Sequence, residues 1–198
     1  MAGIELKKSE AAEELDWLLV QEYKGSENQV TEALFKWFFF SRTTVQKRFL
    51  SKICQVRGKN ASWKEFSLQE KGKKGTADAS IVLGNNSRVL FEFKTKDNAV
   101  SSKQLKRHLK DAGWRPGGKK PKIPRLILVT PDFKTPIKLE KLPEEKRKAI
   151  VWIPWSMVLH FLYKDLRRGL HSDDKMLRDA LLSFLKKDEN LRRHLVVA

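Results

Sequence analysis

Two apolar, β-prone runs lie on either side of a short string of turn-forming residues near the middle of the chain. The runs span 77–83 and 88–94. They are separated by four turn formers, Gly84, Asn85, Asn86 and Ser87. This pattern predicts a β-hairpin. In the second run Glu92 and Lys94 alternate with phenylalanines, so both charged side chains project from one face of the strand. Charged side chains on so apolar a strand indicate a functional site.

A third charged residue, Asp78, lies on the first run. It shares the face of Glu92 if the turn leaves an odd number of residues unpaired, whereas an even turn sends it to the opposite face. We expect an odd turn over 84–86, with Leu83 opposite Ser87. Two carboxylates at one strand end suit Mg²⁺, which prefers oxygen ligands and keeps several waters. The lysine beside them can hold a water or stabilise charge on a scissile phosphate, so the three groups predict metal-assisted phosphodiester hydrolysis.

The other periodic segments predict an α/β fold with a central mixed β-sheet flanked by helices. Strands are expected over 63–70, 77–83, 88–94, 125–130 and 150–153, and helices within 1–25, from 26 onward, and over 101–112, 155–168 and 173–187. The 198 residues contain no evident linker or repeat, which predicts a single domain. Within it we expect an N-terminal helical extension (1–25), a core (26–155) and C-terminal helices (156–198).

The charge of the chain indicates a polyanionic partner. Lys and Arg number 41 against 24 Asp and Glu, a net charge of +17, and segments 42–75 and 101–125 each carry a net +8. Neutralising phosphates with such residues releases counterions and drives nucleic-acid binding. The alternative is a well-solvated basic surface without a ligand. The expected phosphate-binding residues flank the hairpin: Lys71, Lys73, Lys74, Lys103, Lys106, Arg107 and Lys110.

The rest of the composition favours a cytoplasmic protein. The single cysteine, Cys54, excludes an internal disulfide framework and suits a reducing compartment. Residues 1–15 do not form a signal peptide, and the most apolar stretch, 150–163, is too short to span a membrane. We therefore expect no membrane partner.

The motifs around the hairpin resemble the PD-(D/E)XK nuclease superfamily. The matching residues are Gly-Thr-Ala-Asp-Ala-Ser-Ile-Val at 75–82, Phe-Glu-Phe-Lys at 91–94 and Gln-Leu-Lys-Arg-His at 104–108. The resemblance covers residues 26–130 and implies a restriction-endonuclease-like core. It implies Asp78 and Glu92 as metal ligands and Lys94 as a catalytic residue, with catalytic support from Glu27 and Gln104.

The resemblance also implies an activity and its partners. It implies a Mg²⁺-dependent endonuclease, with Mn²⁺ able to substitute, that acts on DNA in preference to RNA and leaves a 5′-phosphate. Such nucleases often act as dimers, so a homodimer is an expected arrangement.

The same residues also have structural or surface interpretations. Asp78, Glu92 and Lys94 also suit a solvated strand face with a cross-strand ion pair. Glu27 suits the first turn of a helix, where an acid interacts favourably with the helix dipole, although it aligns with the buried face at Val30. Gln104 suits an exposed polar stripe that also carries His108, a histidine expected to be structural or at the surface. Glu32 is expected at the surface, paired with Lys36 four residues on.

Two other functions compete with the nuclease. A catalytically inactive nucleic-acid-binding module of the same fold would be expected to have lost a ligand or the lysine, but this chain keeps all three. A structural subunit that binds RNA through its basic faces is the second alternative. A nearby motif, Asp132-Phe133-Lys134, imitates the superfamily's acid and lysine, but no later strand supplies a second carboxylate, so we expect no metal site there.

Overall fold

The computed structural model describes residues 26–56, 62–72, 75–115, 123–166 and 169–195. The helical extension expected over 1–25 lies outside these residues, as do Lys73 and Lys74. Within the described ranges, none of the helices has the length and apolar character needed to cross a bilayer.

The described elements alternate between helices and strands, as expected for an α/β fold. In chain order they are α2 (Ser26–Phe40), α3 (Thr43–Lys52), β1 (Trp63–Lys71), β2 (Thr76–Leu83), β3 (Arg88–Phe93), α4 (Ser102–Asp111), β4 (Leu126–Thr130), α5 (Ile137–Glu140), α6 (Glu144–Arg147), β5 (Ile150–Pro154), α7 (Trp155–His160), the π-helix η2 (Phe161–Asp165), α8 (Ser172–Lys187) and α9 (Glu189–Leu195).

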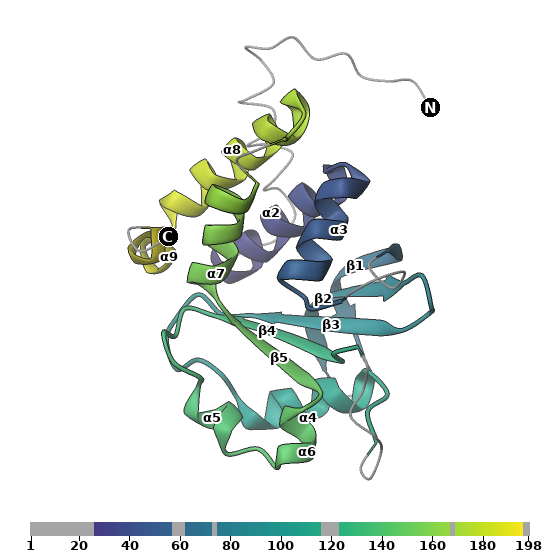
Figure 1. The fold of residues 1–198 in the computed structure, drawn as a ribbon. Coiled ribbons are helices and arrows are strands. Elements are labelled where there is room, and N and C mark those ends of the chain that lie inside the picture. Colours follow the sequence, from purple (N-terminus) through teal and green to yellow (C-terminus); the bar gives the residue numbers. More distant parts are fainter. Residues whose placement is uncertain (1–25, 57–61, 73–74, 116–122, 167–168, 196–198) are drawn as a thin grey trace.

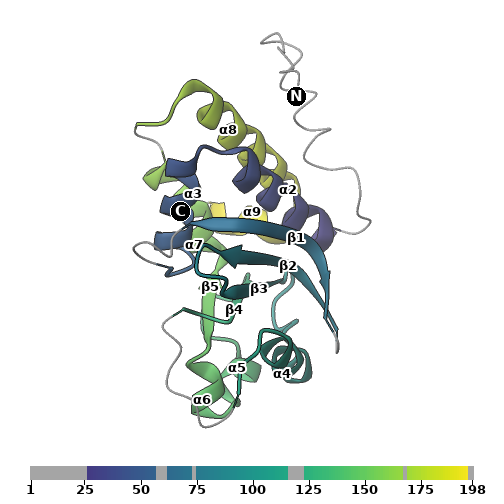
Figure 2. The ribbon, with the colours of Figure 1, turned by 90° about the vertical axis from the view of Figure 1, so that its right-hand side faces the viewer.

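The strands form one five-stranded mixed sheet in the order β1-β2-β3-β4-β5. Strands β1 to β3 pair antiparallel, and β3 to β5 pair parallel. In Figure 1, helices α2, α3, α7 and α8 lie on one side of the sheet, and α4, α5 and α6 lie on the other. Figure 2 shows the same two layers from the side. The predicted mixed sheet flanked by helices is confirmed.

The alternation of β3 divides its side chains between two cores. Val89, Phe91 and Phe93 join the larger core beneath α2, α3, α7 and α8, whereas Leu90 packs in the smaller core with Leu105 and Leu109 of α4. Because side chains alternate along a strand, Glu92 follows Leu90 onto the α4 side. The hydrophobic pattern that builds the two cores therefore also determines which helix faces the candidate site.

Several local features differ from the sequence-based expectations. The helix expected over 155–168 is interrupted, because α7 ends at His160 and continues as the π-helix η2. Helices α3, α5, α6 and α9 were not predicted. Glu32 is fully buried rather than at the surface, although its Oε1 does lie 2.6 Å from Lys36 Nζ.

Candidate active site

A tight turn sets the register of the β2–β3 hairpin. The Leu83 amide donates to the Ser87 carbonyl at 2.9 Å, so three residues, 84–86, lie between the paired positions. Asn86 takes the left-handed conformation at φ 62°, which asparagine tolerates better than most residues. The ladder then pairs Ser80 with Leu90 and Ala79 with Phe91. The odd turn is thereby confirmed, and the same register carries Asp78 to the position opposite Glu92.

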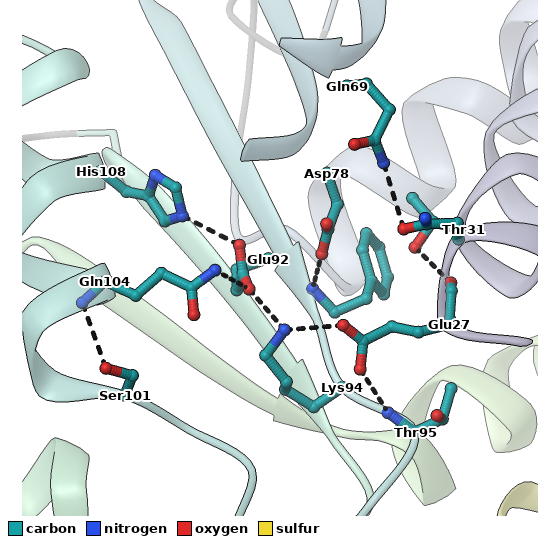
Figure 3. Close-up of polar contacts among 12 residues, drawn as sticks. Glu27, Thr31, Gln69, Asp78, Glu92, Lys94, Thr95, Ser101, Gln104 and His108 are labelled. Carbon is teal, nitrogen blue, oxygen red and sulfur yellow. Dashed lines mark hydrogen bonds and ion pairs between the residues drawn. The ribbon is translucent and has the colours of Figure 1, made fainter. Parts of the chain in front are cut away.

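Lys94 bridges two acidic side chains from opposite sides of the sheet (Figure 3). Its Nζ lies 2.6 Å from Glu92 Oε1 and 2.7 Å from Glu27 Oε1. Glu92 is 1% exposed and Lys94 8% exposed, so the contact is largely shielded from water. The indole N–H of buried Trp155 donates to the Lys94 carbonyl at 2.9 Å and holds the backbone at the end of β3.

The charge of Lys94 is stabilised by these acids. Burial alone would lower the pKa of Lys94, but attraction to Glu92 and hydrogen bonds to Glu27 and Glu92 outweigh it and raise the pKa above the ordinary lysine value. Lys94 is therefore an ammonium at neutral pH. It can donate hydrogen bonds and stabilise negative charge, but it cannot accept a proton.

Helix α4 supplies the remaining partners of Glu92. Ser101 caps the helix by accepting from the Gln104 amide at 3.4 Å, which orients the first turn. The Gln104 side-chain amide donates to Glu92 Oε1 at 2.6 Å, and His108 Nε2 lies 2.9 Å from Glu92 Oε2. Figure 3 shows Gln104 and His108 reaching Glu92 from the same side. Both oxygens of Glu92 thus have protein partners.

His108 is buried against Glu92, which corrects the alternative that it lies at the surface and leaves the structural alternative untested. The signal in the sequence is its spacing from Gln104. Residues four apart lie on the same face of a helix, so a Gln104 directed at the carboxylate brings His108 with it.

Asp78 lies beside this group and is 9% exposed. Its Oδ2 accepts from the Phe93 amide at 2.7 Å. Burial and repulsion from Glu92 raise the pKa of Asp78 from an ordinary 3.8 to about 7, against the opposing effects of the Phe93 hydrogen bond and of Lys94. Burial is the larger of the two causes, and the nearby Glu92 adds to it.

Glu27 comes from the first turn of α2 and joins the site from the opposite layer. Besides its contact with Lys94, its Oε2 accepts from the Thr95 amide at 3.4 Å. The Thr31 hydroxyl donates to the Glu27 carbonyl at 3.0 Å. Glu27 therefore contacts both Lys94 and the backbone just after it. This position favours a site role over that of a dipole-stabilising acid alone.

Of the three acids described at this site, Asp78 and Glu92 belong to paired strands and are the candidate metal ligands, whereas Glu27 belongs to α2. Within the described ranges, no three or more His, Cys, Asp or Glu side chains are grouped closely enough to hold a metal ion by themselves. Mg²⁺ does not need such a cage, because it is commonly bound through one or two carboxylates together with water and substrate phosphates.

The predicted phosphate-binding residues divide into three groups. Lys103, Lys106 and Lys110 are exposed on α4. Arg107 is only half-buried, but its Nε is buried without a hydrogen-bond partner in the described part of the chain, and its guanidinium lies against Gly75. The Lys71 side chain, like Lys73 and Lys74, lies outside what the structure describes.

The ends of β1 and β2 next to Gly72 and Gly75 approach α4 (Figure 2). A Cβ added at Gly72 would lie 2.4 Å from Asp111 Oδ2, and one added at Gly75 would lie 3.6 Å from the guanidinium carbon of Arg107. Glycine at 72 thus permits the close approach. Gly72, next to Lys71, therefore lies against Asp111 at the end of α4.

Comparisons with known proteins do not identify the site. No protein-family model matches the chain, and neither does any curated protein or any solved structure.

Proposed function

We propose that this chain is a Mg²⁺-dependent nuclease of restriction-endonuclease-like fold that hydrolyses phosphodiester bonds in DNA. One observation carries the proposal: Asp78 and Glu92 occupy the next position of the β2–β3 ladder beyond the Ala79–Phe91 pair, and the Lys94 ammonium lies 2.6 Å from Glu92. Two buried carboxylates and a buried cation are the groups that metal-assisted phosphodiester hydrolysis uses.

The order of the elements supports the fold assignment. Helix α2, strands β1 to β3, helix α4 and strand β4 occur in the order that the resemblance to the PD-(D/E)XK superfamily implies, with the additional helix α3 between α2 and β1. The residues of the resemblance fall on the corresponding elements, with Asp78 on β2, Glu92 on β3 and Gln104 on α4.

The donor set fits Mg²⁺. The raised pKa of Asp78, to about 7, arises from burial and from the nearby Glu92, and a divalent cation would relieve both effects. Asp78 and Glu92 would hold the ion, and waters and a substrate phosphate would complete its shell. When bound, such an ion polarises a phosphate oxygen and lowers the pKa of a bound water.

The other residues act as orienting and charge-stabilising groups. Protonated Lys94 would donate to the attacking water or to a non-bridging phosphate oxygen, which stabilises charge as it develops. Glu27 positions Lys94 through its 2.7 Å contact. Gln104 and His108 orient the Glu92 carboxylate through contacts of 2.6 and 2.9 Å.

The charge of the chain supports the choice of substrate. A net charge of +17 and the exposed lysines of α4 favour a polyanion, and the superfamily resemblance favours DNA over RNA and an endonuclease over an exonuclease. The same resemblance carries the proposals that Mn²⁺ substitutes for Mg²⁺ and that the protein acts as a homodimer in the cytoplasm.

A second candidate function is a nucleic-acid-binding module that does not cleave. The bonding of Glu92 favours it, because Lys94, Gln104 and His108 already contact both carboxylate oxygens. An ion could bind only if Glu92 shared or released one of these partners.

Cleavage assays separate the two functions. Wild type would be incubated with supercoiled, linear and branched DNA in Mg²⁺ or Mn²⁺, beside Glu92→Gln, Asp78→Asn and the control Glu140→Gln at an exposed position on α5. The nuclease proposal expects cleavage by wild type and control, and loss of at least about a hundredfold in both site variants. Equal behaviour of wild type and Glu92→Gln on every substrate would refute it.

A further inference from the structure

Phe133 is the most exposed large apolar side chain within the described ranges. Its surroundings differ from those of an isolated exposed residue. It is 60% exposed, and Ile137 nearby in sequence is 57% exposed. Single exposed apolar residues are common and need no explanation. What distinguishes Phe133 is that a buried ring supports it from beneath.

The support comes from α9. The Phe133 ring centroid lies 4.6 Å from that of His194, with the two planes 31° apart, and His194 is fully buried. One face of an aromatic ring is thus packed on the protein while much of the side chain stays open. A ring held in this way loses little freedom when a second flat group packs on it.

A hydrogen bond and an ion pair link the loops after β3 and β4 to each other and to α9. The Asn98 amide, in the loop after β3, donates to Asp132 Oδ1 at 3.1 Å. Arg193 of α9 lies 2.5 Å from Asp97 in the same loop. These contacts join the segments that follow β3 and β4 to α9, so the residue preceding Phe133 is tied to the loop that follows Lys94.

Phe133 and Lys94 lie at the same edge of the sheet. Strands β3 and β4 are parallel neighbours, with Phe93 opposite Val129, so the loops after both strands leave from one edge (Figure 1). Given the strand spacing and the reach of three residues, the Cα atoms of Lys94 and Phe133 are at most about 16 Å apart. At this upper limit, the separation corresponds to about five nucleotides along one strand of B-form DNA.

The charge around Phe133 suits a phosphate backbone. Lys96, Lys134 and Lys138 are exposed on the same loops and on α5. Of the nearby acids, Asp97 is paired with Arg193 and Asp132 accepts from the Asn98 amide, whereas Glu140 at the end of α5 is exposed. Basic residues around an exposed aromatic ring are the combination by which proteins hold single-stranded nucleic acid, since bases stack on the ring while lysines contact phosphates.

We propose that Phe133 is a stacking platform for an unpaired base, and that the candidate site therefore acts on DNA with single-stranded nucleotides beside the cleaved phosphate. This inference rests on the proposed nuclease function for its cleavage part. Its binding part stands on Phe133, His194 and the surrounding lysines.

The test measures binding without turnover. Fluorescence anisotropy in EDTA would compare a single strand, a forked duplex and a blunt duplex for wild type, Phe133→Ala, Phe133→Leu and Phe133→Trp. The matched control is Phe40→Ala, an exposed aromatic on α2 with 52% exposure. Phe133→Leu keeps an apolar contact for His194 but removes the aromatic face, so it separates stacking from folding.

We expect Phe133→Ala and Phe133→Leu to weaken binding of the single strand and the fork about tenfold, and binding of the blunt duplex less than twofold. Phe133→Trp and Phe40→Ala should stay within about threefold of wild type. The fluorescence of a 2-aminopurine base in the fork should be quenched on binding to wild type and not on binding to Phe133→Leu. Equal losses on fork and duplex, or none on either, would overturn the proposal.

The outcome is separable from that of the nuclease proposal. If wild type cleaves nothing in Mg²⁺ or Mn²⁺ but the anisotropy pattern holds, the nuclease proposal fails and the stacking platform stands. If wild type cleaves forks and blunt duplexes equally and Phe133 has no effect on binding, only the stacking platform fails.

Discussion

The charged form of Asp78 lowers the free energy of unfolding, and this effect can be measured without any substrate. Its pKa is about 7 in the folded chain and near 3.8 when unfolded, so between these values the folded state holds a proton that the unfolded state has lost. The stabilisation from this group is therefore complete below pH 3.8 and disappears as the pH rises through 7. At pH 8 without divalent ions, the charged Asp78 destabilises the fold.

The variant Asp78→Asn should reverse that cost. Its amide oxygen can still accept from the Phe93 amide, but it carries no charge. At pH 8 in EDTA we expect its free energy of unfolding to exceed that of wild type by on the order of 1–3 kcal/mol, with the difference shrinking toward pH 5. Urea denaturation at the two pH values measures this. A variant less stable than wild type at pH 8 would contradict the electrostatic account.

His108 should matter for both stability and ion binding. Removing it in His108→Ala leaves Glu92 Oε2 buried without a donor, which costs about 1–3 kcal/mol of unfolding free energy. We also expect the Mg²⁺ concentration for half-maximal cleavage to rise, because Glu92 is no longer held in one orientation. Glu140→Ala, at an exposed position on α5, is the control. An unchanged Mg²⁺ requirement would reduce His108 to a structural residue.

At the scale of elements, the β2–β3 turn makes the site possible because it fixes the register. Asn86 adopts a positive φ of 62°, which β-branched residues tolerate poorly. Asn86→Val should lower the free energy of unfolding by about 1–2 kcal/mol, whereas Asn86→Gly should not lower it comparably. Thermal or urea denaturation of the pair measures the difference. Equal stability of the two variants would mean that the turn does not depend on this conformation.

Element prediction succeeds where the local pattern agrees with the final packing. The apolar runs of β2 and β3 and the turn formers between them specify the hairpin, and the α4 periodicity of Leu105 and Leu109 specifies its buried face. Helix α3 escapes prediction because the β-branched residues Thr43, Thr44 and Val45 have low helix propensity, and burial of one face, which includes Phe49 and Leu50, stabilises the helix.

Site residues on the strands are easier to predict from the sequence than site residues on the helices. The face shared by Glu92 and Lys94 follows from the period of two, and the position of Asp78 follows once the turn is odd. The burial of Glu32 and the contact of His108 with Glu92 depend on which helix packs on which side of the sheet. The local pattern shows which residues share a face of a helix, as Gln104 and His108 do, but the packing of the helices decides what that face contacts.

At the scale of the whole molecule, the charge predicts how binding depends on salt. Each lysine that contacts a phosphate contributes about 0.9 to the slope of log affinity against log salt for duplex DNA. Replacing Lys103, Lys106 and Lys110 with glutamine should reduce that slope by about 2–3. Lys47, Lys164 and Lys175, which are exposed on α3, η2 and α8, provide a triple-variant control with the same loss of charge. Equal slopes for both triples would show that α4 is not the binding face.

Metal-assisted cleavage at this site requires Asp78 and Glu92 to share one divalent ion. Crystals grown with Mn²⁺, examined by anomalous diffraction, test this most directly. We predict one anomalous peak about 2.1 Å from an oxygen of each carboxylate, with Lys94 or Gln104 displaced from that oxygen of Glu92. A peak at other acids, or no peak while Glu92 keeps its contacts with Lys94, Gln104 and His108, would contradict the account.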